Sequence, residues 1–254
     1  MLVSVMSVFH PMRKITSANS NSNKCLNQAF ELNSFPGYDL AQMSPSKIPE
    51  LTLSTRDRIL QAAECLFAEN GIDRVSLREI TAAAGVNIAA VHYHFGSKKV
   101  LLEELFAQRS EPIAKRRLEL LAQVRRDKKG KPVLEDVLHA FLQPALQARE
   151  EPGGASFVLL RARIAFENAE VRKAVLGKAF DASSREFLRI LAQALPALDR
   201  DEMYWRFHFV LGAMVYTMAA PGRIEAITDG AVDSTDSAAA LSRLVAFAAA
   251  GFRA

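Results

Sequence analysis

The chain has 254 residues, half of them hydrophobic, and a formal net charge of +4 at pH 7. A chain of this length and apolar content can bury a core and carry more than one structural unit. Its two cysteines, Cys25 and Cys65, are too few for a disulfide framework, and no apolar run reaches the length of a membrane span. The apolar opening of the sequence lacks the basic region of a signal peptide, so we expect a cytoplasmic protein with no membrane partner.

Positive charge is concentrated in the middle of the sequence. Residues 51–130 hold fourteen Lys and Arg against ten Asp and Glu. Residues 1–50, with four against three, and residues 131–254, with fourteen against fifteen, are close to neutral. A basic unit joined to a near-neutral one is typical of a DNA-binding unit attached to a sensor. Two basic clusters in the middle block, residues 115–117 and 125–129, are expected to solvate one helix face and its end.

Residues 1–50 are rich in Ser, Asn and Pro and have no sustained hydrophobic period. This composition predicts a disordered N-terminal extension. A start codon assigned too far upstream is one alternative, with Met43 the nearest downstream methionine. An arm that touches DNA is another, and the presence of only four basic residues among the fifty disfavours it.

The first helical pattern covers residues 54–71. Apolar residues recur at helical spacing from Ile59 to Phe67, and Asn70-Gly71 is a C-terminal stop. We expect one helix here that ends at Asn70-Gly71.

Residues 76–95 predict two short helices joined by a tight turn. Ser76 and Glu79 match the S-x-x-E capping box that begins a helix. Gly85 permits the cramped backbone of the turn, and Asn87 is placed to cap the second helix. Helix, glycine turn and short helix is the helix-turn-helix pattern, whose second helix fits a DNA major groove. The same pattern also occurs in helical proteins that bind no DNA. Whether this segment binds DNA must therefore be judged from the segments on either side of it.

Residues 55–106 as a whole resemble the DNA-binding domain of the TetR family of bacterial one-component repressors. The matching positions are Ile59-Leu60, Ala62-Ala63, Leu66-Phe67, Asn70-Gly71, Leu77, Ile80, Ala83, Gly85-Val86, Tyr93, Phe95, Ser97-Lys98 and Leu101-Leu102. The resemblance implies a three-helix DNA-binding domain, which we place at residues 51–100.

The resemblance also assigns DNA contacts to the second helix of the motif and to the start of the next helix. It implies base-edge contacts from Ile88, Ala89, Ala90 and His92, and phosphate contacts from Tyr93, His94 and Lys98. Arg78, in the first turn of the preceding helix, is also within reach of a phosphate by its position. The alternative for each residue is a side chain that only faces solvent.

Two positions depart from the pattern that the resemblance implies. Family members often carry a hydroxyl or an amide where this chain has Ile88 and Ala90. Apolar side chains suit thymine methyl groups, so base recognition is expected to depend on such contacts, on His92 and on DNA shape.

The remainder of the sequence is helical in pattern and contains no alternating strand pattern. Pro112 is expected to kink or split the first of these helices, and Pro221-Gly222 begins a polar loop. The predicted helices cover residues 97–126, 134–149, 155–167, 169–194, 199–219 and 237–252. We therefore predict an all-α protein of about nine helices, with a helical ligand-binding and dimerisation domain over residues 101–254.

No catalytic constellation, phosphate-binding loop or metal-ligand cluster occurs in the sequence. His92 and His94 are two residues apart, and residues at that spacing do not share a helix face. We expect neither an enzyme nor a bound metal or cofactor.

The segment 204–216 is apolar nearly all round, so it must be covered on more than one face. The resemblance implies a four-helix bundle across a two-fold axis, built from this helix and the last one. The residues predicted at this dimer interface are Trp205, Phe209, Gly212, Leu241, Leu244 and Ala248. The alternative is that all of this surface is used within one subunit.

Aromatic residues on the central helices could line a ligand cavity or fill a core. The residues predicted to bind a ligand are Phe141, Phe157, Arg161 and Phe187. An arginine among apolar residues could neutralise an anionic head group. Residues 206–213 resemble the C-terminal region of the fatty-acid-responsive branch of the family, which implies an acyl compound or another small amphipathic effector.

These patterns together predict a homodimeric repressor that binds a palindromic DNA operator and is released by a small apolar or amphipathic effector. The alternative is a helical scaffold or nucleoid-type protein that binds DNA without sequence preference, for which the basic block alone would suffice.

Overall fold

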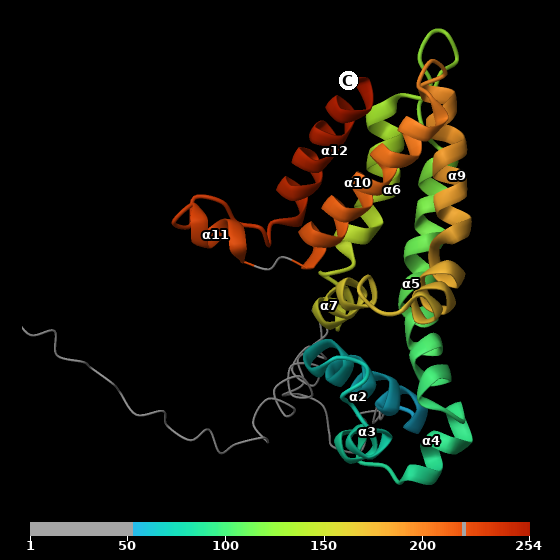
Figure 1. The fold of residues 1–254 in the computed structure, drawn as a ribbon, viewed down its shortest axis with the longest axis vertical. Coiled ribbons are helices and arrows are strands. Elements are labelled where there is room, and N and C mark those ends of the chain that lie inside the picture. The colour runs from blue at the N-terminus through green and yellow to red at the C-terminus, as the bar shows by residue number, and fades with distance from the viewer. Residues whose placement is uncertain (1–52, 220–221) are drawn as a thin grey trace, which may run out of the picture.

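The computed structural model describes residues 53–219 and 222–254, and it consists of a small helical unit below a taller helical bundle (Figure 1). Within those ranges no strand forms, and one isolated bridge joins Arg126 to Pro132. The prediction of an all-α fold is confirmed. The predicted extension, residues 1–50, lies outside the described residues.

The helices follow one another with short connections. In chain order they are α2 (Thr55–Asn70), α3 (Leu77–Ala84), α4 (Ile88–Phe95), α5 (Lys98–Ala122), α6 (Leu134–Gln147), α7 (Gly154–Ile164), α8 (Ala169–Arg172), the π-helical turn η3 (Lys173–Gly177), α9 (Lys178–Ala194), α10 (Arg200–Ala219), α11 (Arg223–Ile227) and α12 (Ser237–Arg253).

Local capping fixes the helix-turn-helix. The Ser76 backbone N–H donates to the Glu79 carboxylate at 2.7 Å, and the Glu79 backbone N–H donates to Ser76 Oγ at 3.2 Å. Gly85 ends α3 in the left-handed region with φ 63° and ψ 40°. The Ala90 backbone N–H donates to Asn87 Oδ1 at 2.9 Å, which begins α4. Each of these capping signals can be identified in the sequence and acts over three or four residues. Because it does not depend on distant contacts, each one is also found in the folded chain.

Helix α5 connects the small unit to the bundle without a break (Figure 1). Pro112 lies inside this helix and does not split it. The loss of one backbone hydrogen bond is offset by packing, because Ile113 and Leu121 on the inner face are buried beneath α6 and α9. The domain boundary predicted at residue 100 falls within the first turns of α5.

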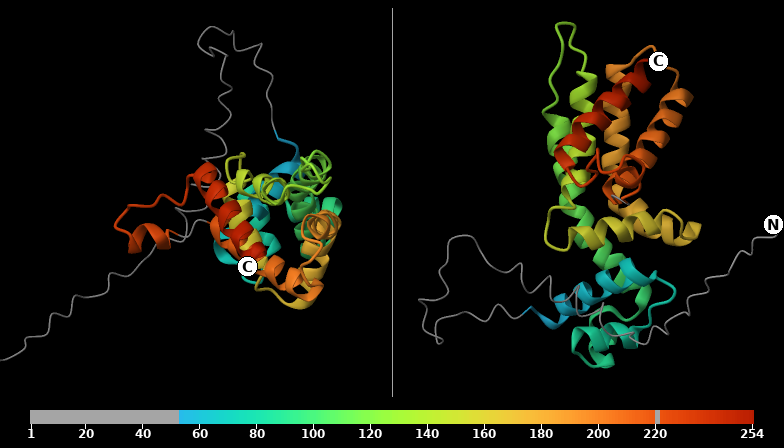
Figure 2. Two further views of the ribbon diagram at one scale, coloured as in Figure 1. Left: turned by 90° about the horizontal axis from the view of Figure 1, so that it is seen from above. Right: turned by 90° about the vertical axis from the view of Figure 1, so that its left-hand side faces the viewer.

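Helix α6 continues through Pro144, within the helix predicted over residues 134–149. The upper bundle differs from the sequence prediction in two places. The helix predicted over residues 169–194 contains the π-helical turn η3 between α8 and α9. The predicted polar loop contains the five-residue helix α11, which is too short to produce a hydrophobic period. The segment around α11 extends sideways from the bundle (Figure 2).

None of the helices in the described ranges combines the length and the apolar character needed to cross a bilayer.

Candidate nucleic-acid interface

Helix α4 presents one face to solvent and buries the other. Val91 and Phe95 are buried and anchor the helix in the core of the small unit, where α4 packs against α2 and α3. The opposite face is exposed along its length, with Tyr93 exposed to 85%. The residues predicted to contact DNA that are exposed or half-buried on this face are Ile88, Ala89, Ala90, His92, Tyr93 and His94.

His92 has a defined tautomer when its ring is neutral. Its Nδ1 lies 3.1 Å from the Gly96 carbonyl oxygen, which can only accept a hydrogen bond. Nδ1 therefore carries the proton, and Nε2 is left as an acceptor that faces away from this contact. An acceptor at this place suits the amino groups of adenine or cytosine in the major groove.

Tyr93 and His94 lie side by side at the C-terminal half of α4. Their ring centroids are 5.1 Å apart in an edge-on arrangement. Because the Tyr93 side chain is largely exposed, its hydroxyl is accessible from solvent. A phenolic O–H is a suitable donor to a phosphate oxygen.

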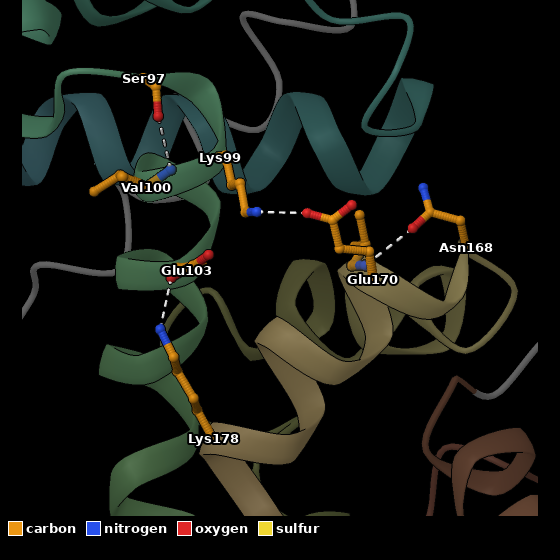
Figure 3. A network of polar contacts seen from close by, with 8 residues as sticks. Ser97, Lys99, Val100, Glu103, Asn168, Glu170 and Lys178 are labelled. Carbon is orange, nitrogen blue, oxygen red and sulfur yellow. Dashed lines mark hydrogen bonds and ion pairs between the residues drawn. The ribbon is translucent and has the colours of Figure 1, made fainter.

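The N-terminus of α5 lies next to this face and carries two lysines with different surroundings. Lys98 is half-buried, with Nζ 5.8 Å from the Phe67 ring centroid and 3.5 Å from the Asp73 carbonyl oxygen. Lys99 forms an ion pair with Glu170 at 2.7 Å (Figure 3). The Lys98 ammonium thus lies at the end of α2 and the loop after it, whereas Lys99 is engaged by the upper bundle. Arg78 is exposed on α3.

Helix α7 of the bundle rests on α2 of the small unit. Arg163 donates from Nε to the Ala68 carbonyl at 2.7 Å and from Nη2 to the Glu69 carbonyl at 3.0 Å. These carbonyls belong to the last turn of α2, where no intrahelical donor is available. Arg163 therefore fastens the end of a DNA-domain helix to the bundle.

A second junction joins α5 to α2 through Glu64 and Arg109. Nε and Nη2 of Arg109 donate to the same oxygen of Glu64 at 2.9 and 2.8 Å. Glu64 is buried, and its other carboxylate oxygen has no hydrogen-bond partner. Desolvation raises the pKa of Glu64 above its ordinary value, and the charge of Arg109 offsets this only in part.

Polar contacts also tie α5 to α8 and α9 (Figure 3). Lys178 pairs with Glu103 at 2.8 Å, one turn beyond the pair of Lys99 and Glu170. Asn168 caps α8 by accepting from the Val171 backbone N–H at 3.0 Å. Because these ion pairs are exposed to solvent, they contribute little to the stability of the fold. Their main role is to orient α5 relative to α8 and α9.

The residues predicted to bind a ligand lie together in the centre of the bundle. The Phe141 and Phe187 ring centroids are 4.4 Å apart, and both rings contact Phe207. Phe157 packs on Phe106 at 5.2 Å. These rings are buried in two groups and fill the core in the structure as it stands. A pocket of about 300 Å³ lies elsewhere, between α10, α11 and α12, and none of the predicted ligand residues lines it.

Arg117 was expected in a solvated basic cluster, and this expectation is wrong. Its side chain is fully buried among the aromatic rings, with the guanidinium carbon 4.0 Å from the Phe141 ring centroid. The register of α5 would have shown this, because Arg117 lies four residues from both Ile113 and Leu121 on the buried face. Its basic neighbours in the sequence concealed that register.

The predicted dimer residues divide into two groups. On α10, Trp205 and Phe209 are 55% and 63% exposed, and Gly212 is exposed beside them. On α12 the predicted residues are buried within the subunit, where α12 packs on α6: Leu241, Leu244 and Ala248. These three side chains cover the subunit's own core, so their assignment to the interface is corrected. Phe247, which is 70% exposed, is the large apolar side chain that α12 offers to solvent.

Comparison with known families gives two matches in consecutive order. The family model described as "Bacterial regulatory proteins, tetR family" matches residues 59–105. The model described as "Tetracyclin repressor-like, C-terminal domain" matches residues 139–251. The first covers the helix-turn-helix with its flanking helices, and the second covers most of the bundle.

Individual relatives match in part. A probable HTH-type transcriptional regulator, YttP, of Bacillus subtilis is 37% identical over 65 residues, which are 26% of this chain and 31% of that protein. The HTH-type transcriptional repressor BepR of Brucella suis is 31% identical over 111 residues, or 43% of this chain and 50% of that protein. The chain therefore spans between about a third and a half of the length of these curated relatives.

A solved structure matches over most of both chains. The TetR family transcriptional regulator PfmR from Thermus thermophilus superposes with a TM-score of 0.53 at 20% identity, and the match covers 78% of this chain and 95% of that one. At this identity the likeness concerns the fold.

A capped helix-turn-helix joined by one long helix to a helical bundle defines a class of two-part helix-turn-helix proteins. The chain belongs to the TetR family of bacterial regulators. Members of this family are DNA-binding transcription factors and not enzymes.

Proposed function

We propose that this protein is a transcriptional repressor that binds a palindromic DNA operator as a homodimer and is released by a small effector. The observation that carries the proposal is the exposed face of α4, which is built on a buried anchor and bounded by Tyr93 and Lys98. Its N-terminal residues enter the major groove, while Tyr93, His94 and Lys98 hold phosphates.

Dimerisation joins two recognition helices so that each contacts one half-site. The support is an exposed aromatic face on α10, formed by Trp205, Phe209 and Tyr216, and Phe247 of α12 lies with Tyr216 at the same pocket. Aromatic side chains at this exposure are costly in a monomer and are enriched in the centre of interfaces. The partner is a second copy of the chain.

The effector acts from the bundle on the DNA-binding unit through α7 and α5. Helix α7 crosses from the aromatic core to the end of α2, where Arg163 holds two carbonyls. A ligand that favours one position of α7 changes the spacing of the two recognition helices, and the coupling required is about 1–3 kcal/mol. A small apolar or amphipathic molecule, such as an acyl compound, matches the apolar surroundings in the bundle.

Selection of bound DNA from a random library tests the proposal. Recovery of an inverted repeat, with half-sites about one helical turn apart, is the expected result. Recovery of no preferred sequence, together with a steep loss of binding as salt rises, would show a non-specific DNA-binding scaffold instead.

The interface itself is tested by Tyr93→Phe, which removes one hydroxyl and leaves the ring in place. We expect weaker binding to the selected site and to single-base variants of it by a similar factor. The control is Ser184→Ala, which also removes one hydroxyl and lies on α9 in the bundle.

A further inference from the structure

Two arginines lie buried in the centre of the bundle without a carboxylate beside them. Arg117 on α5 is fully buried, and Arg161 on α7 is 5% exposed. The guanidinium carbons are 5.4 and 4.3 Å from the centroid of one ring, that of Phe180. Arginines are almost never buried to this extent unless they are paired.

Apart from one backbone carbonyl, the partners of the two guanidinium groups are weak acceptors. Arg117 donates from Nε to the Phe141 carbonyl at 2.8 Å and from Nη2 to the Met214 sulfur at 3.4 Å. Arg161 donates from Nη1 to the Met218 sulfur at 3.7 Å. A thioether is a poor acceptor, and it carries no charge to compensate the arginine. Nη1 of Arg117 is buried with no hydrogen-bond partner at all.

The electrostatics of the pair are unfavourable in this state. Burial, followed by the nearby charge of Arg161, holds the pKa of Arg117 well below its usual value. Burial alone lowers the pKa of Arg161 to about 10, so this group keeps its charge near neutral pH. Stacking on aromatic rings compensates only part of the cost of an isolated buried cation.

We propose that Arg117 and Arg161 form the head-group site for the carboxylate of a small organic acid whose apolar body lies among the surrounding aromatic and methionine side chains. The proposal rests on the proposed function, since it names the chemical class of the effector. The carboxylate accepts from Arg117 Nη1 and is held by the charge of Arg161. A monoanion with two oxygens fits the few donors available, whereas a phosphate would leave several acceptors unsatisfied in an apolar core.

The two methionines supply the room that such a ligand needs. Met214 and Met218 are one turn apart on the inner face of α10, and each lies against one of the two guanidinium groups. Methionine is unbranched and flexible, so these side chains can turn aside at small cost when a carboxylate takes their place. Helix α10 also carries the exposed aromatic face, so the movement begins on the proposed dimer helix.

Isothermal titration of the full-length protein with two acids and their neutral counterparts tests the proposal. The probes are decanoate with decan-1-ol and 4-phenylbutyrate with 4-phenylbutan-1-ol, which cover an aliphatic and an aromatic body. We expect at least one acid to bind, at least tenfold more tightly than its own alcohol. The proposal is overturned if neither acid binds or if acid and alcohol bind equally.

Variants then locate the head group. Arg117→Met and Arg161→Met keep much of the side-chain volume, and each is expected to weaken acid binding at least tenfold while changing alcohol binding less than threefold. Arg185→Met on the exposed face of α9 is the matched control and should bind like the original protein. Retention of full acid affinity by both core variants would place the acid elsewhere. If one variant does not fold, the other variant and the comparison of acid with alcohol still test whether the arginines bind the carboxylate.

Binding to the selected operator separates this inference from the proposed function. An acid that binds through the arginines without releasing the operator would support the head-group site and contradict the effector role. If no sequence-specific operator is found, the titrations still stand, because they do not involve DNA.

Discussion

The side chains of Arg161 and Arg163 extend from the same helix, α7, toward two different parts of the protein. Arg161 ends over the Phe180 ring in the core of the bundle. Arg163, two residues later, donates to the Ala68 and Glu69 carbonyls at the end of α2. Helix α7 is thereby in direct contact with the proposed ligand site and with the DNA-binding unit.

Arg163→Met should loosen the junction between the bundle and α2. The variant leaves two carbonyls in the last turn of α2 without their donors, which costs about 1 kcal/mol at a partly exposed position. Hydrogen exchange of residues 66–71 should become faster while the helicity of the whole protein is unchanged. Arg172→Met on α8 is the control, since Arg172 is an exposed arginine that also donates to a backbone carbonyl. Unchanged exchange at the end of α2 would show that Arg163 does not hold this junction.

Lys98→Ala and Lys99→Ala should separate a phosphate contact from a structural ion pair. Lys98 begins α5, the helix that follows the recognition helix, whereas Lys99 pairs with Glu170 (Figure 3). Loss of one phosphate contact lowers the slope of log K against log salt by about one per contact. Binding titrations at several salt concentrations should show this decrease for Lys98→Ala and no change of slope for Lys99→Ala. The same slope for both variants would remove Lys98 from the DNA interface.

Gly212→Leu should dissociate the proposed dimer without unfolding the subunit. A Cβ atom at position 212 meets nothing within 4 Å in the single chain, so the subunit itself has room for a side chain. Overpacking an interface costs about 1–3 kcal/mol per inserted side chain, and a two-fold axis inserts two.

Light scattering should report a monomer, and circular dichroism should report retained helicity. Ala192→Leu, an equally apolar change at an exposed position of α9, is the control and should remain dimeric. A Gly212→Leu variant that stays dimeric and binds DNA normally would place the interface elsewhere.

Glu64→Gln should change how stability depends on pH. The pKa of Glu64 is raised above its ordinary value of 4.5 in the folded protein, chiefly by desolvation. At a pH between the ordinary pKa of Glu64 and its raised pKa in the folded protein, the folded state binds a proton that the unfolded state does not bind. The original protein therefore gains stability relative to the variant as the pH falls through this window. The measurement is the difference in Tm between the two proteins from pH 7 down to pH 4.5.

Glu79→Gln provides a control of opposite sign for this pH dependence. Hydrogen bonds from Ser76 hold the pKa of Glu79 below its ordinary value. The folded state then binds fewer protons than the unfolded state below pH 4.5, so the original protein loses stability relative to this variant as the pH falls through that lower range. Parallel behaviour of the two variants would contradict the assignment for Glu64.

The helix-turn-helix could be predicted from the sequence because its signals are local. The capping pair of Ser76 and Glu79, the turn at Gly85 and the cap at Asn87 each act within a few residues, and the structure contains all of them. The outward face of α4 followed from the same register, since Val91 had to point inward.

The bundle was harder to predict because its contacts join distant segments. The apolar stripe of α12 indicated that Leu241 and Leu244 are buried, but a stripe does not say whether the covering surface belongs to the same chain. Arg117 was concealed by its basic neighbours, although its spacing from Ile113 placed it on the buried face. Its lack of a carboxylate partner depends on α6, α9 and α10 together, and no sequence window spans these helices.

The unbroken course of α5 has a mechanical consequence. Pro112 removes one hydrogen bond from α5, so the helix bends most easily near this residue, on the side of the buried Arg117. The segment from Lys98 to Pro112 is roughly 21 Å long at 1.5 Å per residue. A rigid rod of that length converts a tilt of about 5° at Pro112 into a displacement of roughly 2 Å at the end that carries Lys98. Helix α5 is therefore stiff near the DNA and bends more easily near the core. With this arrangement, a change of a few degrees in the bundle would alter the distance between the two recognition helices that contact the half-sites.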